Sequence, residues 1–228
     1  MELDSAQHLS SARNIGVRAN NAEALLILDA GDTVAPTAGA SAINVFDADP
    51  LCGIVASWVE YSSGPKPTWR PKGPIELTDA VLAMPIPAVF WFRRDVWEQT
   101  DGFDERFAVL EDWDFCIAVL RAGWSIRVVH RPLARLQARP VPWSVAAPTE
   151  LSAIHAAVVQ KHATVFGQHV DIVLPDVYAQ LIRARVALVK AQHTPSLFRR
   201  LRRRLGTYRF LDRLLTRGGS LLRARRRS

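Results

Sequence analysis

Two groups of acidic residues stand where carboxylates could do chemistry. Asp29 and Asp32 follow the apolar run 24–28, and Glu111 and Asp112 begin a second acidic run with the sequence EDWD. Carboxylates in such positions can bind a divalent cation or act as general bases. The same positions also suit a structural role, because acids favour helix caps and the first helical turn. Spacing alone leaves both possibilities open.

Apolar runs that alternate with helical segments indicate an α/β sheet flanked by helices. We predict strands at 24–28, 53–61, 89–92 and 126–129, the first having the composition of a buried parallel strand. We predict helices at 10–21, 33–47, 94–99, 110–122, 150–166 and 176–192. Functional sites of such sheets lie beyond the carboxyl ends of the strands, which places Asp29 and Asp32 at the expected site.

The chain has 228 residues and a net charge of +7, which is unevenly distributed. Residues 194–228 contain 12 arginines and one aspartate, a net charge of +11, so the remainder carries −4. We predict three parts: a catalytic-type domain at 1–140, a helical extension at 141–193 and an arginine-rich amphipathic tail at 194–228. The apolar stripes and arginines of the tail are typical of helices that lie on anionic membranes, and equally of a solvated tail. The acidic body disfavours a nucleic-acid partner.

Several other features narrow the class of protein. The cysteines Cys52 and Cys116 lack metal-site or disulfide spacing, so we expect both to be buried in a reducing compartment. Neither a signal peptide nor a membrane span is expected from the apolar pattern. His155, His162 and His169 recur at intervals of about 10 Å along a helix, too far apart to share a metal, and we expect them to be partly exposed. We expect a cytoplasmic protein that can lie peripherally at the inner face of the plasma membrane.

Five motifs in order resemble glycosyltransferase family 2, whose members have a GT-A fold. Residues 11–16 (SARNIG) and 26–32 (LILDAGD) are similar to the family's arginine helix and to its aspartate motif after a strand. Residues 92–96 (FRRDV), 102–107 (GFDERF) and 111–115 (EDWDF) are similar to its downstream block. Each motif is weak alone, but the ordered set is specific.

The resemblance implies a GT-A-like, Rossmann-like mixed sheet and an enzyme of the hexosyltransferase type. Such an enzyme transfers a sugar from a nucleotide-diphosphate donor to an acceptor hydroxyl, usually with inversion. The matching positions make Asp112 the catalytic base, with Glu111 beside it. Asp29 and Asp32 would bind the donor and its metal, Mg²⁺ or Mn²⁺. Arg13 would also face the donor, with a solvated helix arginine as the alternative.

The resemblance also implies a biological setting. The acceptor would be a glycan or a lipid-linked sugar, in the synthesis of a bacterial cell wall, surface polysaccharide or glycolipid. An anionic membrane surface is a further partner that the tail allows.

Two departures from the family pattern bear on activity. Gly31 stands where the family's metal motif usually has an aspartate, so we expect weakened metal binding. The sequence also starts at the arginine helix, so we expect an N-terminally truncated domain without the family's nucleotide-binding portion. A glycosyltransferase is therefore the leading hypothesis. The alternative is an inactive remnant that acts as a binding or membrane-docking protein.

Overall fold

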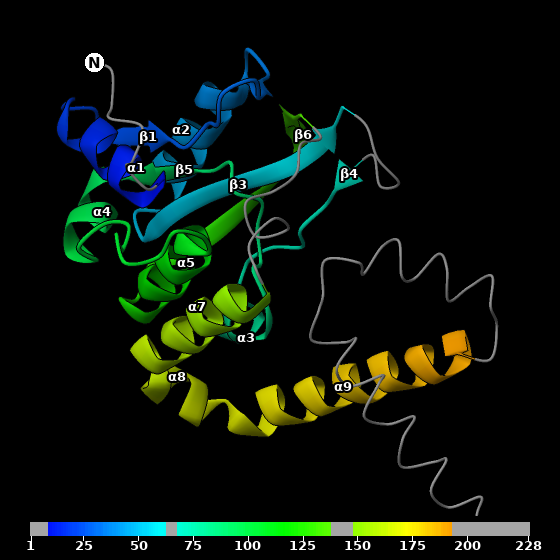
Figure 1. Cartoon of the computed structure of the whole chain (residues 1–228). Helices are drawn as coiled ribbons and strands as arrows, with labels where there is room; N and C mark the ends of the chain where they lie inside the picture. Colours follow the sequence, from blue (N-terminus) through cyan, green and yellow to red (C-terminus); the bar gives the residue numbers. More distant parts are fainter. Residues whose placement is uncertain (1–8, 63–67, 138–147, 193–228) are drawn as a thin grey trace, which may run out of the picture.

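The computed structural model describes residues 9–62, 68–137 and 148–192, and it contains one mixed sheet flanked by helices (Figure 1). The strands are β1 (Ala24–Leu26), β2 (Thr33–Val34), β3 (Cys52–Tyr61), β4 (Thr68–Trp69), β5 (Trp91–Arg93) and β6 (Ser125–Leu136). Their order is β1-β5-β3-β6-β2, and β4 also pairs with β3. β3 and β6 are parallel, whereas the other pairs are antiparallel. The prediction of an α/β sheet is therefore confirmed.

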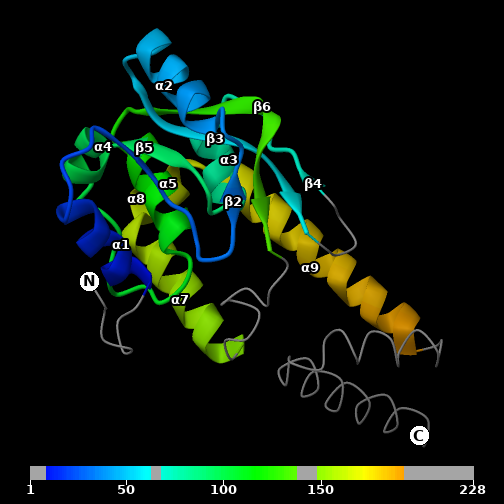
Figure 2. The same ribbon diagram turned by 90° about the horizontal axis from the view of Figure 1, so that it is seen from above.

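Helices cover both faces of the sheet. They are α1 (Leu9–Arg18), α2 (Ala38–Ala48), α3 (Leu77–Leu82), α4 (Arg94–Gln99), α5 (Glu111–Arg121), α7 (Pro148–Lys161), α8 (Ala163–Gln168) and α9 (Val170–Gln192). Neighbouring residues of β3 point to opposite faces: Val55 packs with Phe46 of α2, whereas Ile54 packs with Phe115 of α5. Figure 2 shows α2 and α5 on opposite sides of β3.

An aromatic cluster joins the loop before α5 to the sheet. Phe90, Phe92, Phe103 and Phe115 are all buried, and the ring centroids of Phe103 and Phe115 lie 4.6 Å apart. Phe92 of β5 meets Phe115 edge-on at 5.6 Å. Because large aromatic side chains bury extensive apolar surface, this cluster fixes the position of the segment 102–107 against α5.

Two adjacent arginines attach β5 and α4 to their neighbours. Arg93 donates a hydrogen bond to the carbonyl oxygen of Phe46 at 2.6 Å, near the end of α2. Arg94 donates to the carbonyl oxygens of Val17 (3.1 Å) and Asn20 (2.6 Å), at the end of α1. A cation at this position satisfies carbonyl groups that the helix leaves without partners. Both arginines therefore have structural roles in the motif FRRDV.

The C-terminal helices pack against α5 from below in Figure 1. Val158 of α7 and Phe166 of α8 lie in one hydrophobic cluster with Trp113 and Ile117 of α5. α9 contacts α3 and α8 and then extends beyond the rest of the described structure (Figure 1).

Three predictions about the strands were wrong in detail. Thr33–Val34 does not begin a helix, because it pairs with Ala134 and Arg135 of β6 as strand β2, and α2 begins at Ala38. β1 is half-buried and antiparallel to β5, not a buried parallel strand. β6 is longer than predicted and runs through Leu136. Each difference arises from pairing between distant segments, which overrides local propensity.

The helical predictions were closer. The helix at 94–99 is confirmed with both of its ends, and the helices at 10–21 and 110–122 are confirmed apart from their ends. The segment predicted as one helix at 150–166 is divided into α7 and α8, α9 begins before the predicted 176, and α3 was not predicted. The proposed boundary at 140 and the tail at 194–228 lie outside the described residues, so the three-part division stays a prediction.

Two further observations concern the class of protein. Cys52 and Cys116 are buried and unpaired, as predicted. Across residues 9–62, 68–137 and 148–192, the structure contains no helix that is both long and apolar enough to cross a membrane.

Candidate active site

Arg13 lies at the centre of a buried charge cluster. Its Nη1 atom donates a hydrogen bond to Oε1 of Glu111 at 2.6 Å, and its Nη2 atom lies 3.5 Å from Oδ1 of Asp29. The side chains of Arg13 and Glu111 are 6% and 4% exposed, whereas that of Asp29 is 37% exposed. Arg13 is therefore an interior ion-pair partner, and the alternative of a solvated helix arginine was wrong.

The start of α5 places two adjacent carboxylates in different environments. Leu110 precedes the helix with φ of 66°, a left-handed conformation that is unfavourable by about 1–2 kcal/mol for a residue with a side chain. Glu111 then points into the interior, against Arg13. Asp112 is half-buried, and its Oδ1 accepts a hydrogen bond from the N–H of Trp113 at 2.8 Å. Asp112 is thus the more accessible carboxylate of the two.

Burial raises the pKa of both carboxyl groups. For Glu111 burial and the neighbouring charge of Asp112 raise the pKa to about 7, although Arg13 opposes the shift. For Asp112 burial again raises the pKa, Arg13 opposes it, and the charge of Asp29 adds to it. The four side chains therefore form one electrostatic group. A carboxylate with a raised pKa is a stronger base and a candidate for proton transfer.

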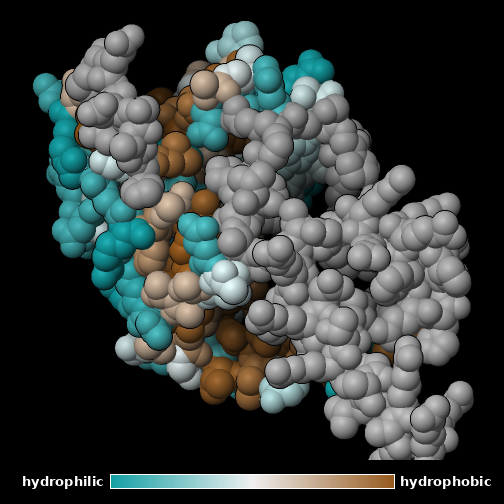
Figure 3. Space-filling model, in the orientation of Figure 1, coloured by the Kyte–Doolittle hydropathy of each residue, from teal (hydrophilic) through white to brown (hydrophobic). Residues whose placement is uncertain are grey.

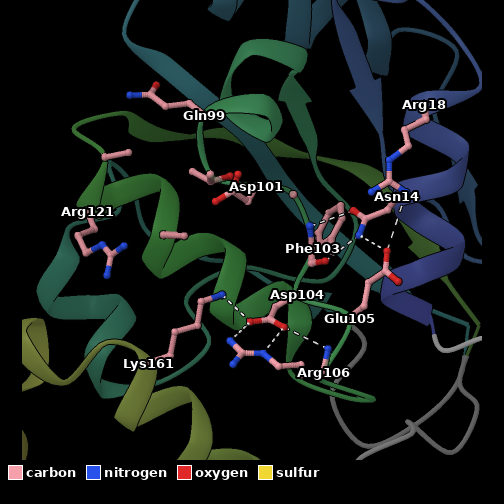
Figure 4. A pocket seen from close by; sticks show the side chains of 14 residues that line it. Asn14, Arg18, Gln99, Asp101, Phe103, Asp104, Glu105, Arg106, Arg121 and Lys161 are labelled. Carbon is pink, nitrogen blue, oxygen red and sulfur yellow. Dashed lines mark hydrogen bonds and ion pairs between the residues drawn. The ribbon is translucent and has the colours of Figure 1, made fainter.

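Asn14, next to Arg13, holds the segment 102–107 in place (Figure 4). Its amide nitrogen donates to the carbonyl oxygen of Phe103 (2.7 Å) and to Glu105 (2.9 Å). Its amide oxygen accepts from the N–H of Phe103 and from the indole of Trp97, both at 3.0 Å. Gly102 has φ of +71°, and a Cβ atom there would lie 2.8 Å from the Asn14 oxygen and 2.5 Å from Trp97 Nε1. The sequence alone did not indicate this role of Asn14, although the residue belongs to the motif SARNIG.

A second charge network connects α7 and the segment 102–107 to α5. Asp114 Oδ1 lies 2.8 Å from His162 Nε2, and Asp114 Oδ2 lies 2.7 Å from Lys161 Nζ. Lys161 also contacts Asp104 at 2.9 Å, and Arg106 contacts the same carboxylate at 2.6 Å (Figure 4). Arg106 and Lys161 hold the pKa of Asp104 well below its usual range.

The prediction that all three histidines are partly exposed was wrong for His162. This side chain is 1% exposed and fills the contact between α5 and the junction of α7 with α8. His155 is exposed on α7, as its helical position suggests. The helix is interrupted after Lys161, and this interruption sets His162 apart from the other two histidines. The regular spacing of seven residues does not reveal it.

Asp32 lies beside the ends of β3 and β6. Its Oδ1 accepts a hydrogen bond from the N–H of Gln137 at 2.9 Å, and its charge adds to the effect of burial in raising the pKa of Tyr61. Its own N–H donates to the carbonyl oxygen of Asp29 at 3.1 Å, so the two aspartates flank one turn. Gly31 in that turn has φ of +89°, and a Cβ atom there would lie 3.2 Å from the Gln137 side chain. The glycine that departs from the family motif therefore suits this turn.

The described residues contain no group of three His, Cys, Asp or Glu side chains placed to hold a metal ion. Mg²⁺ is often bound by one or two carboxylates, with substrate phosphates supplying further oxygens. Asp29 fits that kind of site, because it is partly exposed and lies at a strand end. The assignment of Asp29 and Asp32 as metal ligands stays a prediction.

A pocket of about 670 Å³ lies between α1, the segment 99–106 and α5 (Figure 4). Its lining is strongly charged and includes Asn14, Arg18, Gln99, Asp101, Phe103, Asp104, Glu105, Arg106, Arg121 and Lys161. Asp29, Glu111 and Asp112 do not line it. The pocket is therefore adjacent to the charge cluster and separate from it.

No protein-family model matches this sequence, and no curated protein matches it significantly. Solved structures do match its fold. The structure of S. aureus TarS 1–349 in complex with UDP-GlcNAc matches over 70% of this chain and 48% of TarS 1–349, with a TM-score of 0.55 and 14% identity. A longer S. aureus TarS structure matches over 71% of this chain and 28% of its own, with a TM-score of 0.54 and 14% identity.

A mannosyltransferase, PcManGT from Pyrobaculum calidifontis in complex with GDP-Man and Mn²⁺, matches with a TM-score of 0.48 and 17% identity, too low to add to the assignment. The TarS matches give this chain a GT-A-like glycosyltransferase fold, as expected. The chain spans less than half the length of the TarS structures that it matches. Membership of family 2 stays a prediction.

Proposed function

We propose that this chain is a glycosyltransferase that uses a nucleotide-sugar donor. The proposal rests chiefly on one observation, the convergence of Arg13, Asp29, Glu111 and Asp112 at one point of a GT-A-like fold. TarS, which has a similar fold, binds UDP-GlcNAc. The charge cluster joins α1, the segment that follows β1 and the start of α5, and functional sites of α/β sheets lie beyond strand ends.

In the proposed reaction Asp112 is the general base. Its carboxylate accepts the proton of the acceptor hydroxyl while that oxygen attacks the anomeric carbon of the donor sugar. The bond from the anomeric carbon to the diphosphate oxygen breaks, and the diphosphate leaves with the electron pair. Attack from the opposite face inverts the anomeric configuration. The raised pKa of Asp112 supports this role, because a stronger base removes the proton more readily.

Glu111 has a different proposed role. Its carboxylate is buried and bonded to Arg13 at 2.6 Å, so we assign it to positioning and not to proton transfer. The pair orients Arg13, whose second nitrogen faces Asp29. Arg13 thereby contributes positive charge beside the position proposed for the donor diphosphate.

A divalent cation, Mg²⁺ or Mn²⁺, would neutralise the charge that develops on the leaving diphosphate. Asp29 would hold that cation together with phosphate oxygens of the donor. Asp32 would contribute chiefly by shaping the turn, since its carboxylate bonds the Gln137 N–H.

The proposed acceptor is a hydroxyl of a glycan or of a lipid-linked sugar, in surface polysaccharide or glycolipid synthesis. The two unpaired cysteines are compatible with the reducing cytoplasm, where we propose that the chain acts. The resemblance of the five motifs to family 2 supports the proposed class of acceptor.

The test measures nucleotide release by the full chain from UDP-GlcNAc or GDP-mannose, with and without MnCl₂. We expect Asp112→Asn to lower the rate by about 10²–10⁴-fold while donor binding, followed by calorimetry, stays unchanged. Glu98→Gln, an exposed acid on α4, is the matched control and keeps the wild-type rate. If neither donor binds in the presence of Mn²⁺, or if Asp112→Asn is as active as the wild type, the proposal is wrong.

A further inference from the structure

Helix α9 exposes an unusual amount of apolar surface. Leu174, Val177, Tyr178, Leu181, Ile182 and Val186 are each 46–61% exposed. In Figure 3, hydrophobic atoms gather along the lower edge of the molecule, where Figure 1 places the start of α9. Exposed apolar patches of this kind usually mark an interaction surface.

The apolar residues lie away from the body of the protein. The half-buried positions in the first part of α9 are Val173, Asp176 and Ala179, which recur every three residues and mark the side that faces α3 and α8. At about 100° per residue, Val177, Leu181 and Val186 lie on the sides of the helix and on the surface opposite the half-buried positions. This exposed, largely apolar face spans about half the helix circumference, and the exposed Arg185 and Asp171 lie among its apolar residues.

The distribution of positive charge indicates which kind of partner binds this apolar face. Arg183 and Arg185 lie in the second half of α9, and residues 194–228 that follow carry a net charge of +11, against −4 for the rest of the chain. A broad apolar face next to concentrated positive charge is typical of a helix that lies in the headgroup region of an anionic membrane. Long arginine side chains can lie along apolar surface while their charged ends reach the phosphate groups.

A second copy of the chain fits this surface less well. Self-pairing helices present a narrow seam of two apolar positions per heptad, bordered by charged residues that set the partner. In α9 the apolar positions extend well beyond such a seam, to Tyr178, Ile182 and Val186.

We propose that the exposed apolar face of α9 docks on an anionic lipid bilayer, with the arginine-rich segment after it supplying electrostatic attraction. The body of the protein then lies on the opposite side of α9 from the membrane. This inference is independent of the proposed transferase activity, because lipid binding requires neither a nucleotide sugar nor Asp112.

The first experiment is flotation of the full chain with phosphatidylcholine vesicles, with and without phosphatidylserine. We expect binding only to the vesicles that contain phosphatidylserine, and weaker binding at high salt. The double variant Leu181→Ser with Ile182→Ser should lower the partition coefficient about tenfold or more. The matched control is Leu51→Ser, which is 65% exposed but lies in the turn before β3. Thermal unfolding of each variant verifies that the exposed substitutions leave the fold intact.

A second measurement locates the contact on α9 itself. Both native cysteines are fully buried, so Leu181→Cys can be labelled selectively with a polarity-sensitive fluorophore. We expect a blue shift of its emission with phosphatidylserine vesicles, and none for Leu51→Cys. Flotation without this shift would mean that α9 does not enter the membrane, which overturns the proposal. The proposal is equally overturned if the chain does not float with vesicles. It is also overturned if the chain does not bind vesicles and light scattering instead detects a dimer that Leu181→Ser with Ile182→Ser dissociates. Asp112→Asn should float as the wild type does, which separates this result from the transferase test.

Discussion

The buried ion pair between Arg13 and Glu111 joins α1 to the start of α5, and its removal gives a sharp test of the charge cluster. The Glu111 carboxylate is 4% exposed, and Arg13→Gln removes its 2.6 Å partner. Removing one partner of a buried pair typically lowers stability by about 3–5 kcal/mol. Arg18→Gln is the matched control, because Arg18 lies on the same helix, is 58% exposed, and only approaches Glu105 to 3.9 Å. Its loss should lower stability by less than about 1 kcal/mol.

The effect of Arg13→Gln should depend on pH, with a sign that the structure determines. Burial raises the pKa of Glu111 to about 7 in the folded chain, against an ordinary value of 4.5. Between these values the folded state binds more protons than the unfolded state, so stability is greatest below pH 4.5 and falls as the pH rises through about 7. The full shift corresponds to about 3 kcal/mol. Arg13 opposes the shift, so the Glu111 carboxyl of Arg13→Gln should titrate at a still higher pH. In the range where this one proton is released, the variant should lose up to about 1.4 kcal/mol of its free energy of unfolding per pH unit.

The assay is urea unfolding of wild type and variants at several pH values, followed by the fluorescence of tryptophans such as the buried Trp113. We expect the largest difference between wild type and Arg13→Gln near pH 8 and a much smaller one near pH 5, where Glu111 is protonated. Glu111→Gln in the Arg13→Gln background should restore most of the lost stability, because it removes the unpaired buried charge. A loss below about 1 kcal/mol at pH 8, or a loss that does not shrink in acid, would refute a desolvated ion pair.

Two further substitutions test how α5 is held in place. His162→Ala should lower stability by about 1–3 kcal/mol in urea unfolding, because it removes a 2.8 Å contact from the fully buried Asp114. His155→Ala should lower it less, because His155 is exposed on α7 and loses only its ring contact with Trp113 at 5.5 Å. Equal losses would contradict the assigned network. Gly102→Ala should lower the melting temperature more than Gly123→Ala: both glycines have positive φ, but only at Gly102 does a Cβ atom meet other atoms, at 2.5 Å from Trp97 Nε1 and 2.8 Å from Asn14. The steric part should add about 1–3 kcal/mol, and similar melting temperatures would mean that Asn14 and Trp97 can move aside.

The sequence predicted much of the fold because the responsible signals are local. The apolar run of β3 and the turn glycine after α5, with φ of +89° at Gly123, are visible within a few residues of chain. The helix at 94–99 was predicted with its observed ends. The errors fall where distant segments pair, as when Thr33–Val34 joins β6 as a strand although Pro36 favours a helix start nearby.

The candidate site was partly predictable for the same reason. The motifs identified the acids at 29, 111 and 112 and the arginine at 13, since each motif is a short run. They assigned the base to Asp112 with Glu111 beside it, but they did not predict that these neighbours in sequence have different surroundings. That difference depends on which of them meets Arg13, a residue 98 positions away. The burial of His162 was not predicted because its partner, Asp114, lies 48 positions away on another helix.

The sequence by itself thus determined the α/β class and most of the helices and strands, the positions of the acidic motifs and the concentration of positive charge in residues 194–228. Only the tertiary structure decided which charges are buried together, and which apolar face of α9 is left exposed. The physical reason is that hydrophobic periodicity and turn chemistry act between neighbouring residues. Desolvation, by contrast, depends on which distant segments surround a side chain, so the pKa of a carboxylate and the exposure of a helix face are properties of the assembled fold.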